Sequence, residues 1–91
     1  MVEQVKSFME LNGDWKDIAK KYSDFNDARQ TALKKTMSQC GKDTEFPLGK
    51  DVDLEHENFN YFALCLRSNV NLNPSLNNSK GVRNAVLGWN F

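Results

Sequence analysis

The chain has 91 residues, of which 40% are hydrophobic and 26% are charged, and its 12 basic side chains balance 12 acidic ones. One small core is expected at this length, and an apolar chain with no net charge lacks the composition of intrinsic disorder. Length and composition thus exclude several domains, a disordered chain and wholesale binding to nucleic acid. We expect one folded domain over residues 1–91.

Two further classes are excluded by local composition. Residues 68–79, the longest stretch without a charged side chain, are rich in Asn and too polar to span a membrane. The first residues mix acid and base, so neither a signal peptide nor a transit peptide is expected. Cys40 and Cys65 have no zinc-binding or Cys-x-x-Cys spacing and are expected to be buried free thiols. We therefore predict a cytoplasmic protein without metal or other cofactor.

Apolar residues at helical spacing predict two short helices at the start of the chain. The first covers residues 2–11 and ends at Asn12 and Gly13, which tolerate the left-handed conformation that closes a helix. Asp14 is expected to cap the second helix. Its apolar face consists of Trp15, Ile18, Ala19 and Tyr22.

A third helix is expected after Ser23 and Asp24, which offer a cap, and it ends at Gly41. Residues 42–52 contain Pro47 and Gly49 without a sustained period, which predicts a surface loop. Two apolar residues of this loop are expected to hold it to the core, Phe46 and Leu48. The stripe of the helix is Phe25, Ala28, Ala32, Leu33, Met37 and Cys40.

The segment 53–67 fits two patterns. As a helix it is capped by Asp53 and buries Phe59, Phe62, Ala63 and Leu66, and as a strand it alternates apolar and polar residues as far as Leu72. Helix is favoured up to Arg67, followed by an extended piece over residues 70–72 and a turn at Asn73 and Pro74. The last helix is capped by Ser79 and ends at Gly88, which leaves residues 89–91 as an aromatic tail.

These elements predict a mainly α fold, a compact single domain of four or five short helices. An α+β fold with a short β element around residues 59–72 is the alternative. The aromatic side chains expected to build the core are Trp15, Tyr22, Phe25, Phe59, Tyr61 and Phe62.

The neutral total charge arises from separate blocks. Residues 15–42 carry seven basic and three acidic side chains, a net +4, and residues 43–62 carry one Lys and six acids, a net −5. The basic block lies in a helix-turn-helix outline over residues 14–41, which makes a DNA-binding regulator one hypothesis. Its phosphate contacts would be Lys16, Lys20, Lys21, Lys34 and Lys35, and its base contacts would be Asn26, Arg29 and Gln30.

The acidic block suggests a surface for a basic partner. Its alternating acids are Asp51, Asp53, Glu55 and Glu57. A calcium loop is not expected, because that motif requires Gly where His56 stands and a bidentate Glu where Phe62 stands. At the end of the chain, Trp89 and Phe91 are expected either to pack on the core or to anchor a partner or a second copy in a dimer.

Catalysis has little support in the sequence. The chain has one histidine, His56, and it lacks a Gly-rich phosphate loop, a nucleophile elbow and a metal-ligand cluster. We therefore predict no catalytic residues and no enzyme, with a small thiol enzyme as a remote alternative. The favoured hypothesis is a small binding protein that occludes or tethers a macromolecular partner, a protein rather than DNA. The Asn and Lys bias is compatible with a phage or mobile-element accessory or inhibitor protein.

Overall fold

The computed structural model describes residues 2–10, 15–49 and 52–87. All regular secondary structure within these ranges is helical, so the mainly α prediction is confirmed and the β element around residues 59–72 is wrong. The helices are α1 (Val2–Glu10), α2 (Trp15–Lys21), α3 (Asp27–Asp43), α4 (Phe59–Leu72), α5 (Pro74–Asn77), α6 (Lys80–Val82) and the π-helix η1 (Arg83–Leu87).

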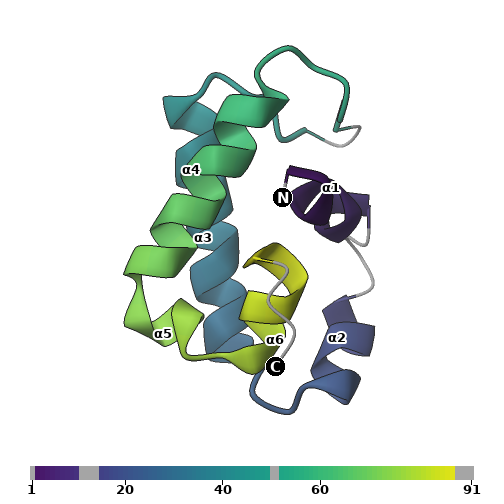
Figure 1. Ribbon diagram of the computed structural model, residues 1–91, viewed down its shortest axis with the longest axis vertical. Helices are drawn as coiled ribbons and strands as arrows, with labels where there is room; N and C mark the ends of the chain where they lie inside the picture. The colour runs from purple at the N-terminus through teal and green to yellow at the C-terminus, as the bar shows by residue number, and fades with distance from the viewer. Residues whose placement is uncertain (1, 11–14, 50–51, 88–91) are drawn as a thin grey trace.

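Two long helices, α3 and α4, pack side by side along the long axis of the molecule (Figure 1). The shorter α1 and α2 lie on the other side, and α6 with η1 runs between the two groups (Figure 1). In this arrangement η1 contacts both α1 and α4, while α2 packs on α6. The last described helices therefore fill the centre of the fold instead of lying on its surface.

The core is apolar and draws on every helix. Its fully buried large side chains include Val5, Phe8, Phe25, Leu33, Phe62, Leu66, Val70, Leu76, Val82 and Val86. The loop after α3 contributes Phe46, whose ring lies 4.8 Å from that of Phe62, and Leu48 packs at the edge of the core. The prediction that Phe46 and Leu48 hold this loop to the core is thus confirmed.

The start of α3 differs from the prediction. The helix begins at Asp27 and its cap is Asn26, whose side-chain oxygen accepts from the Arg29 amide at 3.0 Å, so Ser23 and Asp24 do not cap it. The helix also continues through Gly41 to Asp43. The chain then turns through Glu45, whose φ of 55° lies in the left-handed region. Gly41 therefore does not end α3, and the residue in the left-handed region is Glu45, four residues after Gly41.

The helix predicted from residue 53 begins only at Phe59. Side-chain to backbone hydrogen bonds fold the preceding residues into turns, because such local bonds compete with helix formation. An Asp53 oxygen accepts from the Glu55 amide at 3.0 Å, and His56 Nδ1 accepts from the Asn58 amide at 3.0 Å. The predicted buried residues of this helix, Phe59, Phe62, Ala63 and Leu66, are confirmed.

The extended piece predicted for residues 70–72 is also wrong, since α4 continues to Leu72 with Val70 buried. The helix ends where Asn73 adopts an extended conformation before Pro74. The Asn73 side chain accepts from the Ser75 amide at 3.0 Å and so caps α5, a helix that the sequence did not predict.

A buried polar junction ties the end of the described chain to the turn before α3. Ser79 caps α6 as predicted, accepting from the Val82 amide, and it is fully buried. The Asp24 carboxylate accepts from the Ser79 hydroxyl at 3.0 Å and from the Lys80 and Gly81 amides at 2.7 and 3.1 Å. Asp24 therefore satisfies donors at the start of α6 from more than 50 residues away.

Gly81 allows this close approach. A Cβ atom at this position would lie 2.9 Å from the Tyr22 Cβ, 3.1 Å from the Phe25 Cβ and 3.2 Å from an Asp24 carboxylate oxygen. Any side chain here would push the turn and α6 apart, so the glycine is required by the close approach of the Tyr22 and Phe25 side chains to the α6 backbone.

Candidate functional site

The five lysines predicted to contact phosphates are all exposed, but three of them line different hollows. Lys21 borders a hollow between α1, α2 and η1, while Lys34 borders another beside Trp15 and Lys35 a third beside Cys40. The Lys34 ammonium also lies 5.2 Å from the Trp15 ring centre. Three different hollows therefore each have one of these lysines at their border.

The three side chains predicted to read bases are engaged within the protein. Asn26 caps α3, Arg29 donates to the Asp24 and Ser75 carbonyl oxygens at 2.8 and 3.0 Å, and Gln30 donates to the Phe25 carbonyl at 3.0 Å. In these bonds Asn26 uses only its side-chain oxygen and Gln30 only its side-chain nitrogen, so both amides keep further hydrogen-bonding capacity. These bonds serve the fold, since they hold the turn before α3 and the start of α5.

The acidic side chains predicted to contact a partner are exposed where the structure describes them, at Asp53, Glu55 and Glu57. Glu55 forms an ion pair of 2.6 Å with Lys6 of α1. The remaining predicted partner residues, Asp51, Trp89 and Phe91, lie outside the described residues.

The prediction of buried free thiols is wrong, because Cys40 of α3 and Cys65 of α4 form a disulfide with their Cα atoms 5.7 Å apart. Cys40 is buried and Cys65 is half-buried. Asn69, one turn further along α4, donates to the Cys65 carbonyl at 2.8 Å, and the same nitrogen lies 3.4 Å from the Cys65 sulfur and 3.6 Å from the Cys40 sulfur. A hollow of about 440 Å³ opens beside this group.

A second unforeseen feature is an apolar stripe on the outer side of α4. Tyr61, assigned to the core by the sequence, is 65% exposed, and Leu64 and Leu72 are 54% and 80% exposed. With Ser68 they follow one another at spacings of three, four and four residues, which places them along one face. We call Tyr61, Leu64, Ser68 and Leu72 the outer stripe. The buried residues of α4 lie on the opposite side of the helix.

Arg67 lies beside the outer stripe. Among the described residues its guanidinium has no hydrogen-bonded partner, although its Nε is buried. A shallow hollow of about 210 Å³ is lined by Leu64, Arg67, Ser68, Asn71 and Leu87. No acidic residue occurs in α4, so the cation beside the stripe is uncompensated within its own helix. The stripe thus combines apolar side chains, a recess and an arginine that has no hydrogen-bonded partner among the described residues.

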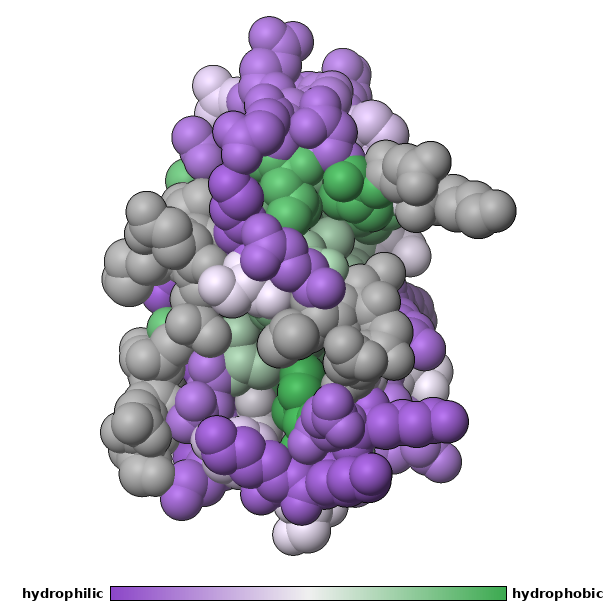
Figure 2. Space-filling model, turned by 90° about the vertical axis from the view of Figure 1, so that its right-hand side faces the viewer, coloured by the Kyte–Doolittle hydropathy of each residue, from purple (hydrophilic) through white to green (hydrophobic). Residues whose placement is uncertain are grey.

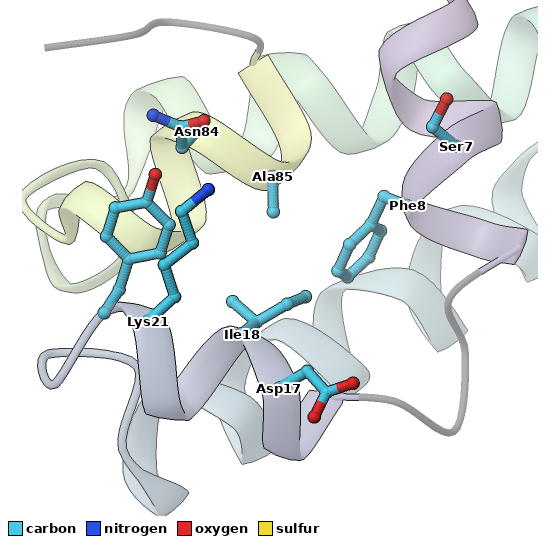
Figure 3. A pocket seen from close by; sticks show the side chains of 8 residues that line it. Ser7, Phe8, Asp17, Ile18, Lys21, Asn84 and Ala85 are labelled. Atoms are coloured by element: carbon cyan, nitrogen blue, oxygen red, sulfur yellow. The ribbon is translucent and has the colours of Figure 1, made fainter.

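The hollow between α1, α2 and η1, which Lys21 borders, has a volume of about 280 Å³. Figure 3 shows Phe8, Ile18 and Ala85 in its middle, with Lys21 and Asn84 together at one end and Ser7 and Asp17 at its border. The face of the molecule that carries α1 and α2 is hollowed, and apolar atoms are visible in its depressions between hydrophilic side chains (Figure 2). Such a site could take a small apolar group.

Other chemistry finds little support in the described ranges. No group of three His, Cys, Asp or Glu side chains is placed there to hold a metal ion. The rings of His56 and Phe46 pack in a T-shaped arrangement, and His56 accepts from the Asn58 amide. Neither contact involves a cysteine. Among the described helices, none has both the length and the apolar character needed to cross a membrane.

Fold and surface together define a mainly α protein with a disulfide between its two longest helices and an apolar stripe on one of them. Comparison of the chain with protein-family models, with curated protein sequences and with solved structures finds no match.

Proposed function

We propose that this protein is a small non-catalytic binding protein that occludes or tethers a protein partner through the outer stripe of α4. The observation that carries the proposal is the exposure of three large apolar side chains along one helix face, directly opposite the buried face of the same helix. A helix apolar on both sides is ordinarily covered on both sides. We therefore infer that the exposed side of α4 is a binding interface.

The chemistry of the partner follows from Arg67. Tyr and Arg are enriched among the residues that dominate binding energy, and a guanidinium that has no partner among the described residues and lies next to a recess favours a carboxylate. We therefore assign the stripe to an amphipathic partner helix that places an apolar side chain in the hollow beside Leu64 and an Asp or Glu side chain against Arg67. The acidic side chains and the aromatic tail that the sequence analysis assigned to partner binding are proposed as additional contacts with this partner.

The test is a photo-crosslinker placed at Ser68, in the middle of the outer stripe, with one at exposed Ala28 of α3 as control. The crosslinked partner is purified, and its affinity is measured for wild type, for Leu64→Ser/Leu72→Ser, for Arg67→Gln and for the control Ala28→Ser. We expect each stripe variant to lose at least about tenfold in affinity, as loss of a binding hot spot does, with the control unchanged.

Two outcomes contradict the proposal. Equal affinity of all four folded proteins would show that the partner binds elsewhere. If light scattering shows a stable dimer that Leu72→Ser dissociates, the stripe belongs to a second copy of the chain and not to a different protein.

A further inference from the structure

The hollow between α1, α2 and η1 is a candidate binding site that the function proposed for the outer stripe does not use. Its lining comes from these three helices and from Tyr22, which follows α2, and it includes no residue of α4. Figure 3 shows its two parts, with Phe8, Ile18 and Ala85 in the middle and Lys21 and Asn84 together at one end. The hollow is thus apolar in its middle and carries a cation at one end.

The apolar middle has room for a ring and is open to solvent. Ile18 and Ala85 are half-buried, so part of each side chain is accessible in the hollow, whereas Phe8 is only 1% exposed and closes it on the side of α1. The volume of about 280 Å³ exceeds the volume of about 150 Å³ in which a protein cavity holds benzene. A benzene ring placed between Ile18 and Ala85 would remove apolar surface of both from water, which favours binding.

Lys21 supplies the positive charge. Its side chain is exposed, and no carboxylate of the described residues forms an ion pair with it. The Lys21 ammonium lies 5.7 Å from the centre of the Tyr22 ring, a cation–π contact that favours this position of a flexible side chain. Figure 3 shows the ammonium directed towards Asn84, whose side-chain amide also carries donor hydrogens. An anionic group at this end would therefore meet a cation and a polar amide.

From these features we infer that this hollow binds a small apolar carboxylate, an aromatic acid of the size of phenylpropionate. The ring lies between Ile18 and Ala85, and the carboxylate pairs with Lys21. Asp17 lies at the border, away from the Lys21 ammonium (Figure 3), and its charge disfavours the reverse orientation of the acid. The inference is independent of the function proposed for the outer stripe, because the two surfaces share no residue.

The experiment measures binding of phenylpropionate to the full chain by an NMR titration at neutral pH. We expect a dissociation constant of about 1 mM or lower, which is ordinary for so small a ligand. Phenylpropanamide has the same ring without the charge and should bind about fivefold more weakly, the upper end of what an exposed ion pair contributes. Absence of binding at about 10 mM acid, or equal affinity for acid and amide, would overturn the inference.

Two variants test the position of the charge. Lys21→Gln removes the charge at the hollow, and Lys20→Gln removes the same charge from a neighbouring exposed lysine that does not line it. Lys21→Gln should bind the acid about fivefold more weakly and the amide as wild type does, whereas Lys20→Gln should match wild type with both ligands. Equal losses of affinity for the acid in the two variants would show general attraction to a positive surface and would overturn the ion pair with Lys21.

The position of the ring is measured in the wild-type protein and so does not depend on the folding of a variant. Nuclear Overhauser effects should connect the ring protons of bound phenylpropionate to the methyl groups of Ile18 and Ala85, because both line the middle of the hollow. Contacts with the methyl groups of Leu64 in their place would put the acid on the outer stripe and would overturn the assigned site.

Discussion

The two faces of α4 carry similar apolar side chains, but one face is buried and the other is exposed. The inner face places Phe59, Phe62, Leu66 and Val70 in the core, where each is less than 5% exposed, and the outer stripe leaves Tyr61, Leu64 and Leu72 more than half exposed. Burial removes apolar area from water at about 25 cal/mol per Å², so the inner face stabilises the fold and the outer face adds little. The difference separates residues required for folding from residues available for binding, although hydropathy alone does not distinguish them.

The largest expected effect comes from Phe62→Ala on the inner face. Phe62 is fully buried and packs on the ring of Phe46, so its truncation should reduce the free energy of unfolding by about 4 kcal/mol. Urea unfolding measures this loss. Tyr61→Ala on the outer stripe is the matched control, and equal losses for the two variants would contradict the assignment of the faces.

Next in size is the disulfide at the flank of α4. Its cysteines are 25 residues apart, and closing a loop of that length in the unfolded chain contributes about 3 kcal/mol. Cys40→Ser/Cys65→Ser should lower the urea midpoint accordingly and should no longer respond to added reductant. A midpoint equal to that of the oxidised wild type would show that the link adds nothing to packing between α3 and α4.

The hydrogen bonds of Asp24 hold the start of α6, and η1, which follows α6 directly, contacts α4. Removing these bonds therefore tests how much the last helices contribute to stability. Asp24→Ala should cost about 2 kcal/mol, as loss of a helix cap does at the upper end of its range. Burial alone would raise the pKa of Asp24, but hydrogen bonds from Lys80, Gly81 and Ser79, aided by Arg29, outweigh it and hold the pKa below its usual value of 3.8.

The lowered pKa of Asp24 gives this loss a pH dependence. A carboxylate with a depressed pKa in the folded state contributes fully above its unfolded pKa and loses its contribution as the pH falls through the folded pKa. The difference in unfolding free energy between wild type and Asp24→Ala should therefore be constant near neutral pH and shrink below about pH 4. A difference that grows on acidification would contradict the hydrogen-bonded carboxylate.

The smallest effect on stability is expected for Leu72→Ser on the outer stripe, which should change the free energy of unfolding by less than about 0.5 kcal/mol. Leu72 is 80% exposed, so little apolar contact is lost. The sharpest measurement is thermal unfolding with and without the partner identified by crosslinking. Without the partner the variant should unfold like wild type, and with the partner it should gain less stability than wild type. A large loss for the isolated protein would place Leu72 in the core.

Periodicity predicted the helices and the inner face of α4 because the same spacing that defines a helix also selects which side is buried. The start of α4 could not be placed in this way, since Asp53 and His56 bind nearby amides and form turns. Ser79 was identified as a cap from its position alone, but its partner Asp24 was assigned to α3, because a cap from a distant segment leaves no local pattern.

The candidate sites were less accessible to sequence reasoning. Nothing in the spacing of Cys40 and Cys65 indicates a disulfide, which forms because α3 and α4 pack side by side. Tyr61 was assigned to the core because it is aromatic and close in sequence to Phe59 and Phe62. Its angular position on the helix is, however, opposite to theirs. The spacing of 61, 64, 68 and 72 was the available signal for the outer stripe.

The junction of Asp24, Ser79 and Gly81 has a consequence for sequence variation. The carboxylate accepts from the Ser79 hydroxyl and from the Gly81 amide, whereas Ser79 also caps α6 and Gly81 also faces the Tyr22 and Phe25 Cβ atoms. Chains that descend from a common ancestor with this fold should therefore carry the aspartate only together with the serine and the glycine. Such linked variation would identify distant relatives even after overall similarity has disappeared.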